Sequence, residues 1–448
     1  MYEEIGSDID ETLTGSLAQH VLAYRQAALP ESAFTVAKQC ILDWFGVTLA
    51  GLTEPVARIV RETVAPGSTG PCTMIGQPNK AAPEVAALVN GTASHALDYD
   101  DVQRDVGHPT VAVLPAVLAA AELTGATGRQ VLTAFIAGVE AAAAVGAMAA
   151  PSHYARGFHT TATIGSFGAA AGAGTLLRLD RGQMSMALGL AGTQAAGLKS
   201  MFGSMTKPFH AGKAASNGLL AARLAAAGMT AHADVLGTTQ GFLHTQVENA
   251  GARPQGFPAP GTRIGDTLFK YHAACYLTHS MMEALRTLRD GHEIAPEAIE
   301  AVAVHVPQGH LGVCNILSPS TGLETKFSLR HCAAYILRGY DTAAIATFSD
   351  TNARDPALVA LRERVAIHGD LTPGMASRVV LHVAGQTFEA EADVGIPERD
   401  LARQASRLDA KFASLAASAI GDTRADRLRS AIASLESAED LQEVMTAT

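Results

Sequence analysis

Residues suited to catalysis are concentrated in the stretch Asn90–Pro109. They are two histidines and four aspartates, namely His95, Asp98, Asp100, Asp101, Asp105 and His108. The flanking segments, Ala82–Val89 and Thr110–Ala121, are apolar and rich in alanine, which predicts a buried helix on each side. Burying a carboxylate without a partner costs roughly several kcal/mol, so acids this close to a packed interior are candidates for a functional site. The alternative interpretation is a solvated acidic loop between two helices.

Basic side chains precede several predicted helices. Their positions are His108, His159, Lys207 and Lys270. His108 and Lys207 each stand directly before a proline, which suits the first position of a helix and holds the preceding residue extended. A cation at a helix N-terminus opposes the helix dipole by about 0.3–1 kcal/mol, and chance placement explains any single case. Four cases together predict an anion site built from free helix amides and basic side chains.

Such a site suits a small carboxylate substrate. Lysine and histidine cations polarise a carboxylate, and a neutral histidine or desolvated lysine removes the proton on the carbon beside it. The remaining cations and the helix amides then hold the developing charge. The fate of the carbanion depends on geometry and stays open.

Other common active-site motifs are missing from the sequence. The glycines of Gly168–Gly174 follow no predicted strand and precede no Gly-Lys-Ser/Thr, so they fit helix packing better than nucleotide binding. Neither Gly-x-Ser-x-Gly nor His-Glu-x-x-His occurs. His95 and Asp98 are spaced to share a metal on a helix, but no third ligand is obvious, so no metal is expected. The five scattered cysteines favour reduced thiols over a disulfide framework.

Composition limits the classes of protein and partner. Of 448 residues, 48% are hydrophobic and 17% are charged, with 42 glycines, which indicates closely packed helices. The net charge of −10 argues against nucleic acid or an acidic membrane surface as a partner. Val131–Ala150 comes closest to a membrane span, but Glu140 lies in its middle, so a buried helix is expected. The acidic segment Met1–Asp8 does not resemble a signal peptide, and a cytoplasmic location is expected.

The pattern of elements predicts two domains of different class. Helical periodicity extends to about Gly228, and Thr238–Gly265 predicts a long loop. Strand patterns begin only after Pro296, and the expected strands are Ile299–Val306, Val365–His368, Arg378–Val383 and Phe388–Ala392. The expected fold is mainly α. An all-helical domain covers residues 1–265 and is completed by helices in 398–448, and a smaller α+β lid domain covers residues 266–397.

Several motifs occur together in a family-specific order. They are Asn90-Gly-x-x-x-His-Ala-Leu-Asp-Tyr-Asp-Asp, Gly107-His-Pro, Gly157-Phe-His-Thr-Thr, Met205-Thr-Lys-Pro-Phe-His-Ala-Gly-Lys, Phe269-Lys-Tyr-His and Glu324-Thr-Lys-Phe-Ser-Leu. With them the chain resembles the MmgE/PrpD family over nearly its whole length. The resemblance implies a homodimer without a cofactor that binds a polycarboxylate between a helical domain and a lid. It also implies active-site roles for Asp98, His108, His159, Lys207 and Lys270.

Members of this family include 2-methylcitrate dehydratase, cis-aconitate decarboxylase and iminodisuccinate epimerase. Overall length and the sequences of these motifs resemble the epimerase most, which implies inversion by two bases, Lys207 and either His108 or Lys270, with Asp98 orienting a base. Further substrate contacts are expected from four residues that also fit a core or capping role, namely Tyr99, Thr160, Lys199 and His210. A dehydratase or decarboxylase is the alternative, although Val102 stands where the decarboxylases have threonine. Two other classes are a carboxylate-binding helical protein without catalysis and a pyridoxal phosphate racemase using Lys207. The racemase lacks a convincing phosphate cradle in the sequence.

Overall fold

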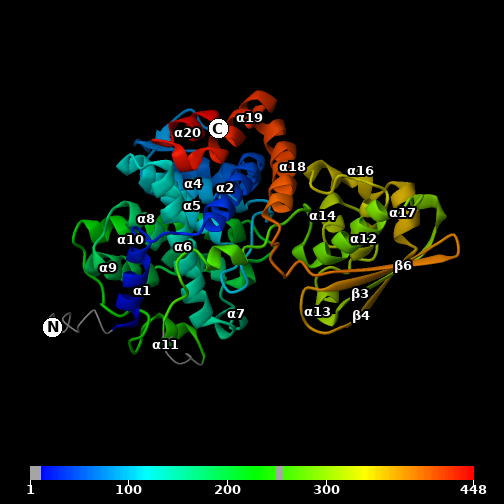
Figure 1. Ribbon diagram of the computed structural model, residues 1–448, viewed down its shortest axis with the longest axis horizontal. Coiled ribbons are helices and arrows are strands. Elements are labelled where there is room, and N and C mark those ends of the chain that lie inside the picture. Colours follow the sequence, from blue (N-terminus) through cyan, green and yellow to red (C-terminus); the bar gives the residue numbers. More distant parts are fainter. Residues whose placement is uncertain (1–11, 249–255) are drawn as a thin grey trace. The chain divides into compact units, whose positions relative to one another are not determined.

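The computed structural model describes residues 12–248 and 256–448 (Figure 1). They form two compact units, one containing the chain up to Thr267 together with Asp400–Thr448, and the other containing Leu268–Arg399. The larger unit is helical apart from one short strand pair, and the smaller contains helices and a four-stranded sheet. The predicted fold class, mainly α with a smaller α+β part, is confirmed. The N-terminal segment Met1–Asp8 lies outside the described residues.

The larger unit consists of helices around a core of small side chains. The helices before the boundary are α1 (Leu13–Ala23), α2 (Glu31–Gly51), α3 (Pro55–Val64), α4 (Pro83–His95), α5 (Pro109–Thr124), α6 (Gly128–Ala149), α7 (Ser152–Ala155), α8 (Thr160–Leu176), α9 (Arg181–Gly192), α10 (Thr206–Ala226) and α11 (Phe242–Gln246). The strands β1 (Cys72–Thr73) and β2 (Lys80–Ala81) pair antiparallel. The predicted continuous loop Thr238–Gly265 is wrong where α11 interrupts it, and its residues 249–255 lie outside the described part.

Glycine lets the central helices approach one another closely. α10 packs against α4, α8 and α5, and every residue of α8 is buried. At Gly212 of α10, a Cβ atom would lie 2.3 Å from the carbonyl oxygen of Leu88, and at Gly218 it would lie 2.4 Å from Ala169 Cβ. Both distances are far below a van der Waals contact, so these crossings require glycine. The close packing fixes the N-terminal ends of α5, α8 and α10, where the predicted basic residues lie.

The C-terminal helices return to the larger unit. They are α18 (Leu401–Ile420), α19 (Asp422–Ala433) and α20 (Gln442–Ala447), drawn in red in Figure 1, and α18 packs against α2. Lys411 of α18 is almost fully buried, and its Nζ lies 2.6 Å from Asp43 Oδ1 and donates to the Tyr99 carbonyl oxygen at 2.7 Å. The ammonium group also lies 3.8 Å from the centre of the Tyr99 ring. Lys411 thereby links the stretch Asn90–Pro109 to the C-terminal segment.

Helix α6 is long and apolar enough to cross a membrane by length and composition alone, and no other helix among the described residues meets that test. Most of its apolar window, 78%, is buried inside the protein. Glu140, in the middle of α6, accepts hydrogen bonds from the Tyr24 hydroxyl and from the backbone N–H groups of Gly261 and Ile264. These contacts make α6 a core helix of this unit, as the position of Glu140 predicted.

The smaller unit is built around one mixed sheet. Its strands are β3 (Ile299–Pro307), β4 (Val365–Leu371), β5 (Ser377–Val383) and β6 (Gln386–Ala392), in the spatial order β4-β3-β5-β6. β3 pairs parallel with β4, and the other neighbours pair antiparallel. Its helices are α12 (His279–Gly291), α13 (Gln308–Leu311), α14 (Gly322–Thr325), α15 (Leu329–Leu337), α16 (Asp350–Ala353) and α17 (Pro356–Arg362). All four predicted strands are present. The β5–β6 turn places Ala384 at φ 48° and Gly385 at φ 75°, as a tight hairpin requires.

Replacing Gly212 with alanine tests the close packing of α10. We expect Gly212→Ala to destabilise the protein by about 1–3 kcal/mol, because the Leu88 carbonyl cannot move away without shifting α4. The matched control is Gly182→Ala in α9, where the nearest atom to the new methyl group is Asp180 Oδ1 at 3.4 Å. Thermal unfolding followed by circular dichroism measures both, and equal midpoints for the two variants would contradict this account of the helix crossing.

Candidate active site

The loop that contains the clustered aspartates, residues 96–108, lies between two buried helices. α4 ends at His95 and α5 begins at Pro109, with His108 as the residue before it. Gly107 has φ 86°, and a Cβ atom there would lie 2.6 Å from Thr161 Oγ1 of α8, so only glycine allows this approach. The backbone N–H of His108 donates to the same Thr161 oxygen at 3.0 Å. This end of the loop is therefore fixed against α8.

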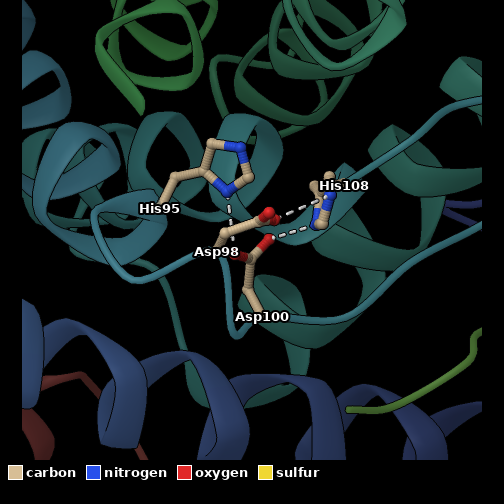
Figure 2. A group of neighbouring side chains, drawn as sticks. All are labelled: His95, Asp98, Asp100 and His108. Carbon is tan, nitrogen blue, oxygen red and sulfur yellow. Dashed lines mark hydrogen bonds and ion pairs between the residues drawn. The ribbon is translucent and has the colours of Figure 1, made fainter. Parts of the chain in front are cut away.

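Two aspartates of this loop hold the two histidines (Figure 2). Asp100 is about 1% exposed, and its Oδ1 accepts a hydrogen bond from His95 Nδ1 at 2.8 Å. The other oxygen of Asp100 lies 2.8 Å from His108 Nδ1, close enough for a hydrogen bond but without the alignment that one requires. Asp98 is half exposed, adopts φ 51°, and places Oδ1 3.4 Å from His108 Nε2. His108 thus lies between a buried carboxylate and an accessible one.

Lys207 reaches the accessible carboxylate from α10. Its Nζ lies 2.7 Å from Asp98 Oδ2, and its ammonium is 5.4 Å from the centre of the Phe202 ring. Lys207 is the second residue of α10, which begins at Thr206 and not at Pro208 as predicted. An imidazole and an ammonium group therefore share one carboxylate, Asp98, at the N-terminal ends of two helices.

His159 brings a third helix N-terminus to this cluster. It is the N-cap residue of α8, as predicted, and His108 is likewise the N-cap residue of α5. The rings of His159 and His95 are stacked with their centres 6.2 Å apart, and His159 Nδ1 lies 3.1 Å from His210 Nδ1, where one ring donates and the other accepts. Burial and then the neighbouring cationic groups lower the pKa of His159 to about 2, and burial lowers the pKa of His210. His159 is therefore a neutral imidazole at pH 7.

The other predicted site residues have different surroundings. Tyr99 is about 1% exposed and lies against Lys411 in the interior. Lys199 donates to the Tyr154 carbonyl oxygen at 3.1 Å, and its ammonium lies 3.6 Å from the centre of the Tyr154 ring. Thr160 is the first residue of α8 and lies beside Gly107, because a Cβ there would meet its Oγ1 at 3.1 Å.

Lys270 belongs to the smaller unit, three residues after Thr267, where the larger unit ends before its C-terminal helices return. It is about 3% exposed and helps to lower the pKa of His279, after the burial of that ring and the charge of His272. Lys270 lies ahead of a helix, as predicted, but α12 begins nine residues later, at His279, so Lys270 does not lie at the N-terminus of that helix. Its meeting with Asp98, His108, His159 and Lys207 stays a prediction.

The sequence itself matches known protein families over most of its length. Residues 15–255 match the MmgE/PrpD N-terminal domain, and residues 272–437 match the MmgE/PrpD C-terminal domain. The chain belongs to the MmgE/PrpD family. The predicted family is thus confirmed, and its two domain models meet close to the boundary between the compact units.

Several curated relatives of this chain are named cis-aconitate decarboxylase, which is a lyase. The human cis-aconitate decarboxylase is 28% identical over 345 residues, which cover 73% of this chain and 70% of the relative. The mouse cis-aconitate decarboxylase is 27% identical over 383 residues, which cover 80% of this chain and 76% of the relative. The cis-aconitate decarboxylase of Aspergillus terreus is 31% identical over 278 residues, which cover 58% of this chain and 57% of the relative. These relatives favour the lyase alternative, and none supports the predicted likeness to iminodisuccinate epimerase.

Two further residues of this MmgE/PrpD site, His95 and Asp100, lie within Asn90–Pro109. No catalytic or substrate-binding role is predicted for either of them from the sequence. Burial raises the pKa of Asp100, but the charges and hydrogen bonds of His95 and His108 outweigh it and hold this pKa below its ordinary range. Burial lowers the pKa of His95 to about 4 despite the attraction of Asp100. No local pattern indicates that Asp100, and not Asp98, is the buried aspartate. The one sequence feature that indicates burial in this region is the alanine-rich helix that ends at His95.

The composition of the cluster also suits a metal ion. One ligand atom from each of His95, Asp98, Asp100 and His108 lies within 4.8 Å of the others. The reason for expecting no metal, the lack of a third ligand, is therefore wrong. In this arrangement, however, the Lys207 ammonium already supplies a cation to Asp98, and two imidazoles contact Asp100. Both carboxylates of the cluster therefore already have partners among its own side chains.

Neighbouring buried residues should give opposite dependences of stability on pH. The pKa of His95 falls from 6.5 to about 4 on folding, so its contribution to stability is present above pH 6.5 and is lost as pH falls toward 4. The pKa of Asp101 rises from 3.8 to about 7, mainly through burial, so its contribution is lost as pH rises from 3.8 toward 7. Each effect is on the order of 3–4 kcal/mol.

The variants His95→Asn and Asp101→Asn separate the two contributions. As the pH rises from about 4 to 6.5, the wild type should become more stable relative to His95→Asn. As the pH rises from about 4 to 7, the wild type should become less stable relative to Asp101→Asn. Urea unfolding at a series of pH values measures both differences. Parallel pH profiles for the wild type and both variants would refute the assigned protonation states.

Proposed function

We propose that this protein is a cofactor-independent lyase that releases carbon dioxide from a small unsaturated polycarboxylate of the cis-aconitate type. The observation that carries the proposal is the accessible Asp98 carboxylate shared by His108 Nε2 and Lys207 Nζ. Proton-carrying groups converge there with the ends of three helices. The names of the curated relatives support the same class of reaction.

The proposed reaction needs one proton for each carbon dioxide released. When a carboxylate next to an allylic carbon leaves as carbon dioxide, the electron pair of the broken C–C bond remains on the allylic system. A protonated group then delivers a proton to carbon, which completes the product. Lys207 Nζ is placed to do so, and so is His108 Nε2 when the ring carries a second proton; both side chains can also bind the substrate carboxylates that remain. We assign Asp98 to hold the two groups before the substrate arrives.

Epimerisation at the carbon next to a carboxylate is the second candidate. It uses the same acid–base groups, with a proton removed on one face and returned on the other. The observation that favours it is Val102, which replaces the threonine of the decarboxylases. Elimination of water, as in 2-methylcitrate dehydratase, is the third outcome of the same carbanion chemistry. Lys270 as a further base, assembly as a homodimer and a cytoplasmic location belong to this proposal as well.

Reaction with cis-aconitate, citrate-type and aminodicarboxylic acids in deuterated water tests the proposal. We expect carbon dioxide release from the unsaturated tricarboxylate, with one solvent deuteron bound to carbon in the product. Lys207→Met should lower kcat by about 10²–10⁴, the usual contribution of a general acid or base. Lys80→Met, which removes an exposed lysine paired with Glu122, is the control and should retain activity.

Other outcomes of this assay identify the competing functions. Deuterium exchange with inversion and no carbon dioxide indicates an epimerase, and loss of water indicates a dehydratase. Binding without exchange indicates a carboxylate-binding protein. Visible absorbance of the purified protein and activity dependent on pyridoxal phosphate indicate the racemase. Each of these results would overturn decarboxylation as the main activity.

Removal of divalent metals should leave the reaction unchanged. Lys207 already neutralises Asp98, so we expect equal rates before and after dialysis against a strong chelator. The measurement is the initial rate of carbon dioxide release, with metal content followed by atomic emission. A rate that falls on dialysis and recovers with added zinc or magnesium would show that the cluster of His95, Asp98, Asp100 and His108 works as a metal site.

A further inference from the structure

Asp100 joins two imidazoles through the same nitrogen of each ring. Its Oδ1 accepts a hydrogen bond from His95 Nδ1, and its Oδ2 lies 2.8 Å from His108 Nδ1. Figure 2 shows this carboxylate facing both rings. Because both contacts use Nδ1, the Nε2 of each ring points away from Asp100. The Nε2 of His108 is thereby left on the side of Asp98, the carboxylate that also binds Lys207.

The charge of Asp100 determines where the proton of His108 lies. Asp100 is almost fully buried, and each of its two oxygens lies 2.8 Å from an imidazole nitrogen, an arrangement that stabilises the ionised carboxylate. An ionised carboxylate only accepts hydrogen bonds, so a ring nitrogen that faces it carries a proton. Nε2 faces a carboxylate as well, but Asp98 Oδ1 lies farther away, at 3.4 Å, and the Lys207 ammonium is already paired with Asp98. The closer contact of Nδ1 with Asp100, at 2.8 Å, therefore holds the proton of a neutral His108 ring on Nδ1 and leaves Nε2 unprotonated.

His95 holds the same carboxylate from the interior. The ring is about 1% exposed and neutral at pH 7, and its proton lies on Nδ1, where it is donated to Asp100. Its Nε2 is buried and has no hydrogen-bond partner among the described residues. The contact through which His95 contributes to the site is therefore the one to Asp100.

We propose that Asp100 is a positioning residue that fixes the orientation and the tautomer of His108, and that His95 holds Asp100 in place. The inference rests on the proposed function in one respect, because it takes His108 to be a group that transfers a proton. Asp100 and His95 are both too buried to contact a substrate from solvent, and they act through His108. A carboxylate behind an imidazole increases catalysis by holding the reactive tautomer.

The neighbouring Asp101 provides a matched control. It is also about 1% exposed, but it accepts a hydrogen bond from the Thr110 hydroxyl and has no described contact with an imidazole. Asp100→Asn and Asp101→Asn therefore make the same side-chain change at adjacent buried positions. A merely structural role for Asp100 predicts similar effects of the two changes on kcat. The positioning role predicts a large effect for Asp100→Asn alone.

The first experiment is nitrogen NMR of protein labelled in its histidine rings. At about pH 8, where an ordinary imidazole is neutral, the wild type should show His108 protonated at Nδ1 and not at Nε2. The His108 signals are identified by their loss in His108→Gln. In Asp100→Asn the fixed tautomer should be lost, and in Asp101→Asn it should be kept. A His108 protonated at Nε2 in the wild type would overturn the inference, whatever the enzyme's activity.

The second experiment is steady-state kinetics of the same variants. Asp100→Asn should lower kcat by about 10²–10⁴ with little change in KM, and Asp101→Asn should change kcat by less than about threefold. His95→Asn keeps a donor near the position of Nδ1 and should retain more activity than His95→Leu, which has none. Equal kcat values for His95→Asn and His95→Leu, or for Asp100→Asn and the wild type, would overturn the positioning role.

The two readouts distinguish this inference from the proposed function. A wild type without turnover on any polycarboxylate refutes the proposed function, while the tautomer of His108 still decides for or against the arrangement around Asp100. If Asp100→Asn does not fold, the wild-type tautomer and the comparison of His95→Asn with His95→Leu decide in its place.

Discussion

The site depends on one buried carboxylate held between two imidazoles. Asp100 has hardly any contact with water, and its negative charge is tolerated because His95 and His108 each present Nδ1 to one of its oxygens. An unpaired charge at this depth would be strongly destabilising. The loop conformation follows from this requirement. It must leave α4 at His95, place Asp100 against the ring of that residue, and return to α5 at His108.

Several features of the helical unit serve to hold this loop. Gly107 allows the loop to contact α8, where Thr161 fixes the backbone of His108. Behind the loop, Lys411 binds both Asp43 and the Tyr99 carbonyl, so the C-terminal helix α18 supports the same segment. The glycines of α10 bring its N-terminus, with Lys207, against the helices that carry the histidines. The accurate placement of a few polar groups thus requires close packing of the whole helical unit.

Adjacent aspartates show how strongly local partners control chemistry. Asp100 and Asp101 are neighbours in sequence and equally buried, yet one has a lowered pKa and the other a pKa raised to about 7. The difference lies in their partners, because two imidazoles face Asp100, whereas the Thr110 hydroxyl and two other carboxylates surround Asp101. The same loop therefore contains an anion and an acid that is about half protonated at pH 7, and the half-exposed Asp98 is left to meet the solvent, Lys207 and the substrate.

The sequence by itself determined the class of each segment, because helix and strand periodicity are local properties. It identified the small-residue helices, the strands of the smaller unit, the reactive stretch and the family. It also placed His108 and His159 at helix N-termini, since proline, glycine and threonine signal such positions locally. It did not reveal which aspartate is buried, that Tyr99 lies under Lys411, or that Lys199 contacts Tyr154. Those outcomes were decided by residues distant in the sequence, because burial and the pairing of charges arise only when separate helices pack together.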